Sequence, residues 1–556
     1  MAPPWGAVLR RPSHLGRTAV AIVQRGRGLA LAALILFSAL VHADDTGTTQ
    51  VSTSTAAEGC TRGSENESFW QRLADSYKAH LVPIDAPSTG GTAAAPPGTD
   101  ASSAAVPSID AGGYRRGLSP PPESVPPWPY ATWPMGGTPA IGYENIYYGP
   151  LMDAIWCGKN GKKWKDSRFT IYGWMEPGGN ISTSNTHYNL TTGTGGNYPA
   201  AYTYEPNKLQ LDQVTLYFER TPDEIQTDHF DWGFRFTALY GRDYKFTFSN
   251  GILSDQYTES GHLYGFDPVM YYLDFYFPRI GAGTNLRVGR YVSIPDIEAQ
   301  LAPNNLSYTH SLLYIYDPYT QNGILSTTKF NRNWTLQLAV SGGNDIRPFL
   351  AHENHLTPAM CVVWQSDSGN DELYPCMNGL NDSNWRWDNI QHAVTTWYHK
   401  FNAKWHTATE LWYTWQAHTP NVSNPDGTAV ITARYPAPSF NFGAPFGAQC
   451  DPRVVYCYSY AWAAVNYVNY QYTSRDIFTW RSGYLDDASG QRTGFKNRYA
   501  EFALGYTHWI GDALELRPEV SFDHAFNTDA YDNPTATAGG GKKSQLMLAA
   551  DLILHF

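Results

Sequence analysis

The chain has 556 residues and a net charge of −11; 16% of its residues are charged and 15% are aromatic. This acidic balance, with no basic stripe between aromatics, argues against a nucleic-acid-binding protein. The mean hydropathy of −0.40 is too low for a helical membrane protein, whereas a β-barrel keeps such values because every second wall residue faces water.

Residues 1–43 have the features of a secretory signal peptide. Five arginines between positions 10 and 27 precede an uncharged apolar run over 28–41, and Val41 and Ala43 occupy positions −3 and −1 of a cleavage after Ala43. An uncleaved anchor is the alternative, although the run is short for a spanning helix. No other stretch is long and apolar enough to span a membrane as a helix, so a membrane protein of this sequence must be a barrel.

Residues 44–167 are predicted to form a periplasmic low-complexity arm. Segment 69–81 has Trp70, Leu73 and Tyr77 at helical spacing, which predicts one short helix. The Pro-, Ala- and Gly-rich sequence that follows lacks the apolar content to offset its ordering entropy, so we expect it to be disordered. A tether to the cell wall or to an oligomer partner is the alternative.

From residue 168 onward, long segments alternate between apolar and polar residues. Phe230 and Trp232 alternate with Asp231 and Arg235, and segment 514–523 repeats the pattern. Pro518 within that segment suggests a bulge or a local gap in the ladder. Charged residues along one face are costly in a soluble core but natural on a water-filled lumen.

The pattern predicts an all-β, transmembrane antiparallel β-barrel of about 14 strands over residues 168–556. The strands are expected to start near 168, 209, 229, 268, 284, 323, 333, 390, 403, 458, 474, 497, 512 and 542. Short connections alternate with long ones, as periplasmic turns and external loops of barrels do. Counts of 12 or 16 also fit, because connection 344–389 could hide a hairpin.

Connection 294–322 is the best candidate for a loop that folds into the lumen, because it is too apolar for a solvent-exposed loop. Folding inward would bring two acidic residues near basic residues of the wall, and opposed charges create a transverse field that selects ions. The predicted constriction residues are Asp296, Glu298, Arg235, Arg287, Arg290 and Arg517. A surface cap with a few ion pairs is the alternative.

The six cysteines lie in segments that the pattern places outside the barrel strands. In an oxidising compartment Cys361 could pair with Cys376 and Cys450 with Cys457, each pair stapling one loop, and Cys60 could pair with Cys157. Free thiols are the alternative. Recurrent tryptophans are predicted to be mostly interfacial belt residues, although a few could line the lumen and stack on sugars; they are Trp397, Trp405, Trp412, Trp415, Trp462, Trp480 and Trp509.

The last eleven residues form a strand pattern that ends in a terminal aromatic. Leu552 and Leu554 share its apolar face, and the chain ends with Phe556. This resembles the C-terminal signature of outer-membrane barrels and implies recognition by the barrel assembly machinery.

Several long segments resemble the OmpL-like β-barrel porins of Gram-negative bacteria. They are YGWMEPGGNIS (172–182), FDWGFRFTALYGRDY (230–244), the stretch 265–291 and SIPDIEAQLAPNN (293–305), together with Phe556. The resemblance covers roughly residues 168–556 and leaves the arm unexplained. It implies a porin in the outer membrane and brings no substrate and no catalytic residues.

Enzyme motifs are missing from the sequence. There is no GxSxG, HExxH or phosphate-binding loop, and the spacing of His352, Glu353 and His355 does not suit a zinc site. An outer-membrane hydrolase with a Ser–His pair is the alternative. We expect no enzyme, cofactor or metal.

We therefore expect a porin that lets small hydrophilic solutes diffuse passively across the outer membrane. It is expected to contact outer-membrane lipid, and assembly into homo-oligomers is an option. The rivals are a plugged barrel that works through its external loops as an adhesin or binding protein, and a secreted aromatic-rich lectin.

Overall fold

The structure is a computed structural model that describes residues 64–81, 141–142, 149–189, 194–292, 296–316, 318–350, 353–368, 370–402, 404–435, 447–473, 475–511, 513–534 and 540–556. The predicted signal peptide (1–43), most of the predicted arm, Cys60 and His352 lie outside these residues.

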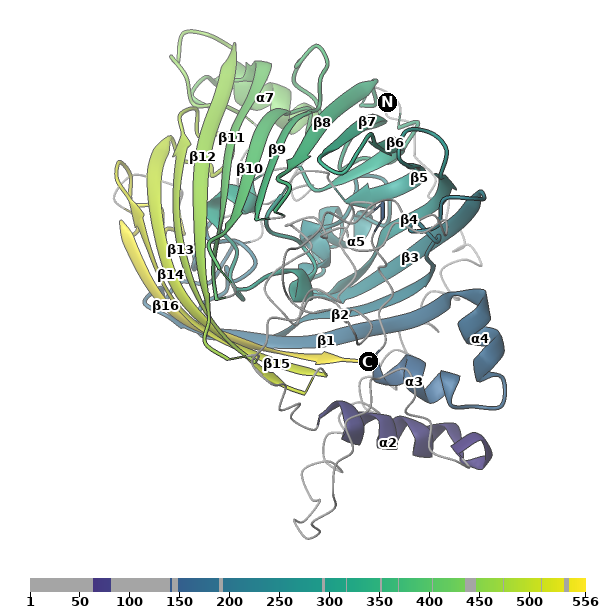
Figure 1. Ribbon diagram of the computed structural model, residues 1–556. Helices are drawn as coiled ribbons and strands as arrows, with labels where there is room; N and C mark the ends of the chain where they lie inside the picture. The colour runs from purple at the N-terminus through teal and green to yellow at the C-terminus, as the bar shows by residue number, and fades with distance from the viewer. Residues whose placement is uncertain are drawn as a thin grey trace, which may run out of the picture. The chain divides into compact units, whose positions relative to one another are not determined.

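Sixteen antiparallel strands form one closed barrel in which each strand pairs with its neighbours in sequence and β1 pairs with β16 (Figure 1). The strands are β1 (Phe169–Ser182), β2 (Leu209–Arg220), β3 (Asp231–Gly241), β4 (Gly265–Phe277), β5 (Thr284–Val292), β6 (Thr320–Lys329), β7 (Trp334–Asn344), β8 (Thr357–Gln365), β9 (Asp371–Asn378), β10 (Gln391–Lys400), β11 (Trp405–Pro420), β12 (Tyr456–Gln471), β13 (Asp476–Asp487), β14 (Asn497–Ile510), β15 (Leu514–Ala525) and β16 (Ser544–His555).

The barrel prediction is confirmed, but the strand count of about 14 was two short. All fourteen predicted strands are present, and the two extra strands, β8 and β9, form a hairpin inside the predicted connection 344–389. Pro358 and Pro375 lie in these strands, and proline weakens a strand pattern because it cannot donate to the ladder. The β8–β9 pairing skips the positions around Pro375, between the pairs Cys361–Cys376 and Trp364–Leu373.

Pro518 behaves in the same way. Pairing between β14 and β15 stops at Gly505–Glu519 and resumes in the same register at His508–Leu516. The missing N–H of Pro518 thus falls in a local gap of the ladder rather than at a bulge.

The two faces of the wall separate as the alternation predicts. Outward side chains such as Trp232, Phe236 and Leu516 are 40–43% exposed, whereas Arg235 and Arg517, which point to the other face, are buried. The outer face of the wall is therefore apolar, and the polar residues gather on the inner face, as is usual for membrane barrels.

Helical segments lie before the first strand and in the loops. They are η1 (Ser64–Asn66), α2 (Phe69–His80), α3 (Pro150–Trp156), α4 (Gly161–Ser167), η4 (Asp243–Phe246), α5 (Asp255–Thr258), η5 (Ala302–Asn304), α6 (Leu312–Ile315) and α7 (Pro425–Arg434). Of these helical segments, only α2 was predicted from the sequence, as the short helix over residues 69–81. Among the described residues, no helix combines the length and apolar character needed to cross a membrane.

Helix α2 lies against the end of the barrel where the chain terminates (Figure 1). Ser68 caps its first turn, the Tyr77 hydroxyl donates to the carbonyl of His555 at 3.1 Å, and His80 lies 2.7 Å from Asp153 of α3. The helix is therefore tied both to α3 and to the last strand of the barrel.

The hydrophobic core lies inside the barrel. It brings wall residues such as Tyr172, Trp174 and Tyr217 together with Leu301 and Leu313 from the connection between β5 and β6. A loop that contributes apolar side chains to this interior must fold inward.

Candidate functional site

The connection between β5 and β6 crosses the barrel interior. We call residues 296–316 the inner loop. Its backbone and side chains contact β2, β11, β13, β14 and β15. Strands β13 and β14 are on the opposite side of the closed ring from β5 and β6, so the inner loop spans the lumen.

The local sequence explains why the inner loop holds a defined shape. Asn305 closes a turn, because its side chain accepts from the Ala299 N–H at 2.8 Å and donates to the Ala299 carbonyl at 2.6 Å. Ser311 caps α6 by accepting the Tyr314 N–H at 3.2 Å. Glu298 in turn accepts the Ser311 N–H at 2.9 Å. Backbone groups in a loop lack the hydrogen-bond partners that a helix or sheet would provide. These side chains supply hydrogen bonds to such groups.

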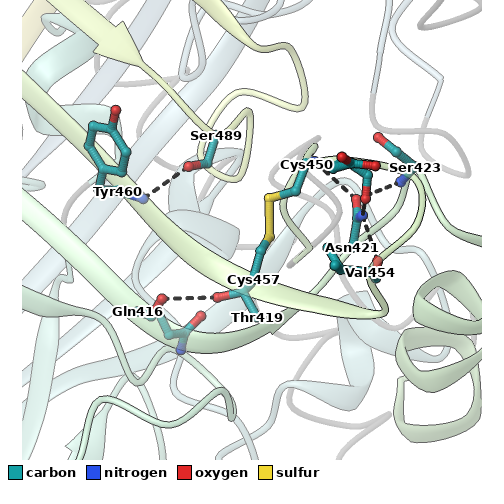
Figure 2. Close-up of a disulfide and its surroundings, with 10 residues drawn as sticks. Gln416, Thr419, Asn421, Ser423, Cys450, Val454, Cys457, Tyr460 and Ser489 are labelled. Carbon is teal, nitrogen blue, oxygen red and sulfur yellow. Dashed lines mark hydrogen bonds between the residues drawn. A yellow bond between two sulfur atoms is a disulfide. The ribbon is translucent and has the colours of Figure 1, made fainter.

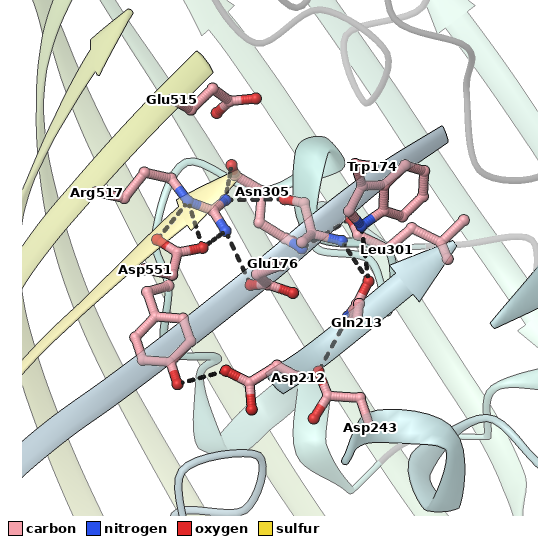
Figure 3. Close-up of polar contacts among 12 residues, drawn as sticks. Trp174, Glu176, Asp212, Gln213, Asp243, Leu301, Asn305, Glu515, Arg517 and Asp551 are labelled. Carbon is pink, nitrogen blue, oxygen red and sulfur yellow. Dashed lines mark hydrogen bonds and ion pairs between the residues drawn. The ribbon is translucent and has the colours of Figure 1, made fainter. Parts of the chain in front are cut away.

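Arg517 of β15 anchors the first half of the inner loop (Figure 3). Its guanidinium forms an ion pair with Asp551 of β16 and donates to the carbonyls of Ala302 at 2.8 Å and Asn305 at 2.7 Å. A guanidinium offers five donors in a fixed plane, which suits this simultaneous contact with a carboxylate and two carbonyls.

A second set of charged wall residues anchors the other half. Arg481 of β13 donates to the hydroxyl of Thr309 at 2.8 Å. Glu519 of β15 accepts the Thr309 N–H at 3.3 Å, and Glu501 of β14 accepts the Leu312 N–H at 3.0 Å. The side chains of Arg481, Glu501 and Glu519 are at most 3% exposed. The wall and the inner loop are therefore joined by charge-assisted hydrogen bonds.

The two predicted acidic residues of the inner loop lie near this second anchor. Glu298 is buried with Ser311, and burial raises its pKa although Arg481 and the Ser311 hydrogen bonds oppose the shift. Asp296 shares a hydrogen bond with the carboxyl group of Glu410 of β11, which also accepts the Ile297 N–H at 2.9 Å.

Three predicted basic residues pair with acidic neighbours instead of facing the inner loop. Arg235 binds Glu219 at 2.6 Å, and the predicted Arg287 binds Asp274 at 2.8 Å. These are cross-strand neighbours in register.

Arg290, the third of these predicted residues, binds Asp267 at 2.8 Å. Both side chains are fully buried. Of the predicted arginines, Arg517 is the one whose bonds to the inner loop are seen.

Four further residues that hold the inner loop were not predicted from the sequence: Arg481, Glu410, Glu501 and Glu519. Their positions in the alternating strand patterns would have placed them on the inward face. The pattern alone gives no reason to choose them over other inward charges.

The predicted disulfide partners are joined in the structure. Cys361 and Cys376 are directly paired across β8 and β9 and are buried, so this disulfide lies in the wall and not in a loop as predicted.

The second disulfide, Cys450–Cys457, connects the long loop between β11 and β12 to the start of β12 (Figure 2). The side chain of Asn421 accepts the Cys450 N–H at 3.0 Å and donates to the Val454 carbonyl at 2.8 Å. The loop is thus fixed beside the end of β11. Cys157 is disulfide-bonded.

Four of the seven highlighted tryptophans, Trp397, Trp405, Trp462 and Trp480, are 41–46% exposed, in keeping with a belt. Trp412 and Trp509 are buried, and the Trp412 indole donates to the Leu313 carbonyl at 3.1 Å. That tryptophan therefore helps to hold the inner loop.

Glu353 and His355, the described members of the His–Glu–His segment, form hydrogen bonds with neighbouring loop residues. Glu353 accepts from Arg434 at 2.8 Å and from the Tyr435 hydroxyl at 3.0 Å, and His355 lies 2.6 Å from Asn389. Within the described part of the chain, no group of three His, Cys, Asp or Glu is placed to hold a metal ion.

The comparisons with known proteins agree with this architecture. The family model described as "Putative beta-barrel porin-2, OmpL-like" matches residues 168–556. No curated protein matches the chain.

Similar solved structures include an anion-selective porin from Comamonas acidovorans, at 10% identity and a TM-score of 0.43, covering 70% of this chain and 99% of that one. The outer membrane channel DcaP of Acinetobacter baumannii matches at 11% identity and a TM-score of 0.41, covering 70% and 97%. OmpT of Vibrio cholerae matches at 6% identity and a TM-score of 0.40, with the same coverage as DcaP.

The family match covers most of the chain and coincides with the closed barrel, whose family and fold are those of a channel. The chain therefore belongs to the OmpL-like β-barrel porin family and is a passive-diffusion porin of the bacterial outer membrane.

Proposed function

We propose that small hydrophilic solutes pass through this porin beside the inner loop, which narrows the lumen and sets what passes. The observation that carries the proposal is the inner loop itself: it crosses the lumen and is bonded to charged residues on the far wall. Solutes would then diffuse down their gradients past fixed charges, which attract or repel them according to sign.

The charged wall gives the narrowing its chemical character. Arg481 and Arg517 each contact both the inner loop and a wall carboxylate. Because these charges are fixed by the barrel, they do not need to reorganise when a solute arrives. Solute passage in this scheme needs no covalent step, and we propose that the chain has no catalytic activity.

The remaining partners follow from the surface and the ends of the chain. The apolar outer face would contact outer-membrane lipid. The last strand, which ends in Phe556, would be recognised by the barrel assembly machinery. Leu552 and Leu554 lie next to Phe556 on β16. Assembly into homo-oligomers is also proposed.

We also propose the domain organisation of the chain: a signal peptide over 1–43, a periplasmic arm over 44–167 and a barrel over 168–556. The contact between Tyr77 and His555 supports a place for α2 at the periplasmic end of the barrel.

A second candidate is a closed barrel that acts through its external loops as an adhesin or binding protein. The observation that favours it is the burial of inward wall residues: Thr479, Arg481 and Asp487 of β13 are each at most 2% exposed. The Cys450–Cys457 disulfide would give such loops a fixed binding surface.

Single-channel recording separates the two candidates. The protein, extracted from outer membranes in detergent, is added to a planar bilayer after its heat-modifiable gel mobility shows that it is folded. Discrete, reproducible current steps support the porin path. If folded protein gives no current steps, the porin path is contradicted and the closed barrel is favoured.

One deletion and one double substitution then test where the solute path lies. Removing residues 425–434, which form the external helix α7, should leave the conductance unchanged. Replacing Arg517 and Arg481 by glutamine should release the inner loop and change the conductance. If the deletion alters the current and the arginine replacements do not, the inner loop does not define the path.

A further inference from the structure

Three carboxylates gather on the interior wall beside the inner loop. They are Glu176 of β1, Asp212 of β2 and Asp243 of η4 (Figure 3). Their exposed fractions are 3%, 2% and 4%. They come from neighbouring segments around the β1–β2 side of the barrel.

Protein donors satisfy only part of this cluster. Asp212 accepts from the Tyr308 hydroxyl and from Gln210, both at 2.8 Å, and Asp243 accepts from Gln213 at 3.0 Å. The second oxygens of Glu176 and Asp243, Oε2 and Oδ1, are buried and have no hydrogen-bond partner among the described residues. Two buried carboxylate oxygens are therefore left without a hydrogen-bond donor from the described residues.

Two arginines lie near the cluster, and Arg242 acts electrostatically on both Asp212 and Asp243. Arg517 pairs with Asp551 and reaches Glu176 only at 3.4 Å. The guanidinium of Arg242 lies over the ring of Tyr204 at 4.9 Å and is 3.9 Å from Glu205.

The cluster consequently carries more negative than positive charge. Burial and the charge of Asp212 raise the pKa of Asp243, and they outweigh the opposing hydrogen bond from Gln213 and the charge of Arg242. Such an excess in a low-dielectric interior is costly unless a cation or a proton neutralises it.

A single metal ion does not suit this arrangement, because no three of the described carboxylates are positioned to ligate one. An ammonium group places less strict demands on geometry, since it donates three hydrogen bonds in flexible directions. A molecule with two such groups can reach carboxylates that lie too far apart for one ion.

We propose that Glu176, Asp212 and Asp243 form a recognition site for small organic cations with two ammonium groups, and that this site makes the pore favour cationic solutes. The inference deepens the proposed function and rests on it for the transport step. The free oxygens of Glu176 and Asp243 receive the ammonium hydrogens, and Tyr308 holds Asp212 in place from the inner loop.

Putrescine is the probe, and the test has a binding arm and a current arm. Calorimetric titration of the folded detergent-solubilised protein measures binding, and reversal potentials in a tenfold KCl gradient measure the ratio of potassium to chloride permeability. The variant combines Glu176→Gln, Asp212→Asn and Asp243→Asn. The control combines Asp75→Asn, Asp166→Asn and Asp426→Asn, which removes the same number of charges at exposed helix positions.

We expect saturable putrescine binding in the native protein and in the control, and at least a tenfold loss in the variant. The permeability ratio should exceed one in the native protein and fall at least threefold in the variant alone. If the triple variant does not fold, Asp243→Asn, which lies outside the strands, is measured alone and should show the same direction.

The two arms separate failure of the inference from failure of the pore. Current steps with no effect of the variant on binding or selectivity overturn the cation site and leave the porin. No current from folded protein overturns the proposed transport, and putrescine binding that the variant abolishes then still supports the site.

Discussion

Phe556 and Gly173 exchange both backbone hydrogen bonds across the seam that closes the barrel. The Phe556 N–H donates to the Gly173 carbonyl at 2.9 Å, and the Gly173 N–H donates to the Phe556 carbonyl at 3.0 Å. A Cβ atom on Gly173 would lie 2.0 Å from the Thr215 carbonyl and 2.8 Å from the ring of Phe556. The terminal aromatic thus passes over the seam only because residue 173 has no side chain.

Gly173→Ala should therefore weaken closure of the barrel. Displacing the β2 backbone and the Phe556 ring is expected to cost about 1–3 kcal/mol, as overpacking usually does. The measurement is the fraction of protein with folded, heat-modifiable mobility after refolding, which should fall several-fold. Gly505→Ala is the control, because the nearest atom to its Cβ would be 3.7 Å away. Equal folding of the two variants would contradict the role given to Gly173.

The strands could be predicted well because alternation survives in most of them. The exceptions, β8 and β9, are short and contain Pro358 and Pro375. The barrel tolerates Pro375 because the ladder skips its position. Local patterns do not reveal such a gap, since it depends on the partner strand.

The inner loop could also be foreseen from its apolar residues, but its electrostatic partners could not. The pairs Arg235–Glu219, Arg287–Asp274 and Arg517–Asp551 are direct neighbours across paired strands. Knowing that a residue faces inward does not give the register of its neighbour strand, and a register shift changes every pair. The excess of acidic groups around Glu176 could not be predicted for the same reason, because it depends on how β1 and β2 are aligned.

Helix α2 should detach from the barrel when its contacts are removed. Leu73 of α2 is buried, and the Tyr77 hydroxyl donates to the carbonyl of His555. Leu73→Ala is expected to cost about 2–3 kcal/mol of docking free energy, and Tyr77→Phe about 1 kcal/mol. Limited trypsin digestion reports detachment through faster cleavage after Arg72 and Lys78. Trp70→Ala is the control, since Trp70 is 68% exposed; equal cleavage rates in all variants would mean that α2 is not held by these contacts.

Asp532 should make the junction between the β1–β2 loop and the β15–β16 loop sensitive to acid. It accepts the N–H groups of Asn185 at 2.9 Å and Thr186 at 2.7 Å and pairs with Lys542 at 2.8 Å. Burial opposes its ionisation, but the hydrogen bonds from Lys542 and Thr186 outweigh burial and lower the pKa to about 2. Because this folded-state value lies below the unfolded value of about 4, the stabilisation is complete above about pH 4 and is lost as the pH falls through 2.

Hydrogen exchange at the Asn185 and Thr186 amides, corrected for the intrinsic rate, measures this loss. Protection should be constant above pH 4, decrease toward pH 2, and be weak at every pH in Asp532→Asn. The amide of Asn421, which donates to the Val455 carbonyl at 2.8 Å, is the internal control. Protection at Thr186 that does not depend on pH between 5 and 2 would show that the carboxylate does not hold this junction.

Tyr308 of the inner loop lies close to Gly178 of β1. A Cβ on this residue would lie 2.4 Å from Asp212 Oδ2 and 2.5 Å from the Tyr308 hydroxyl. Gly178→Ala should therefore break the bond between Tyr308 and Asp212 and loosen the inner loop without removing any charge. We expect a change in single-channel conductance and more frequent current fluctuations, while Gly505→Ala leaves both unchanged. Because the barrel wall is otherwise intact, unaltered currents in Gly178→Ala would mean that docking of Tyr308 does not control the width of the path.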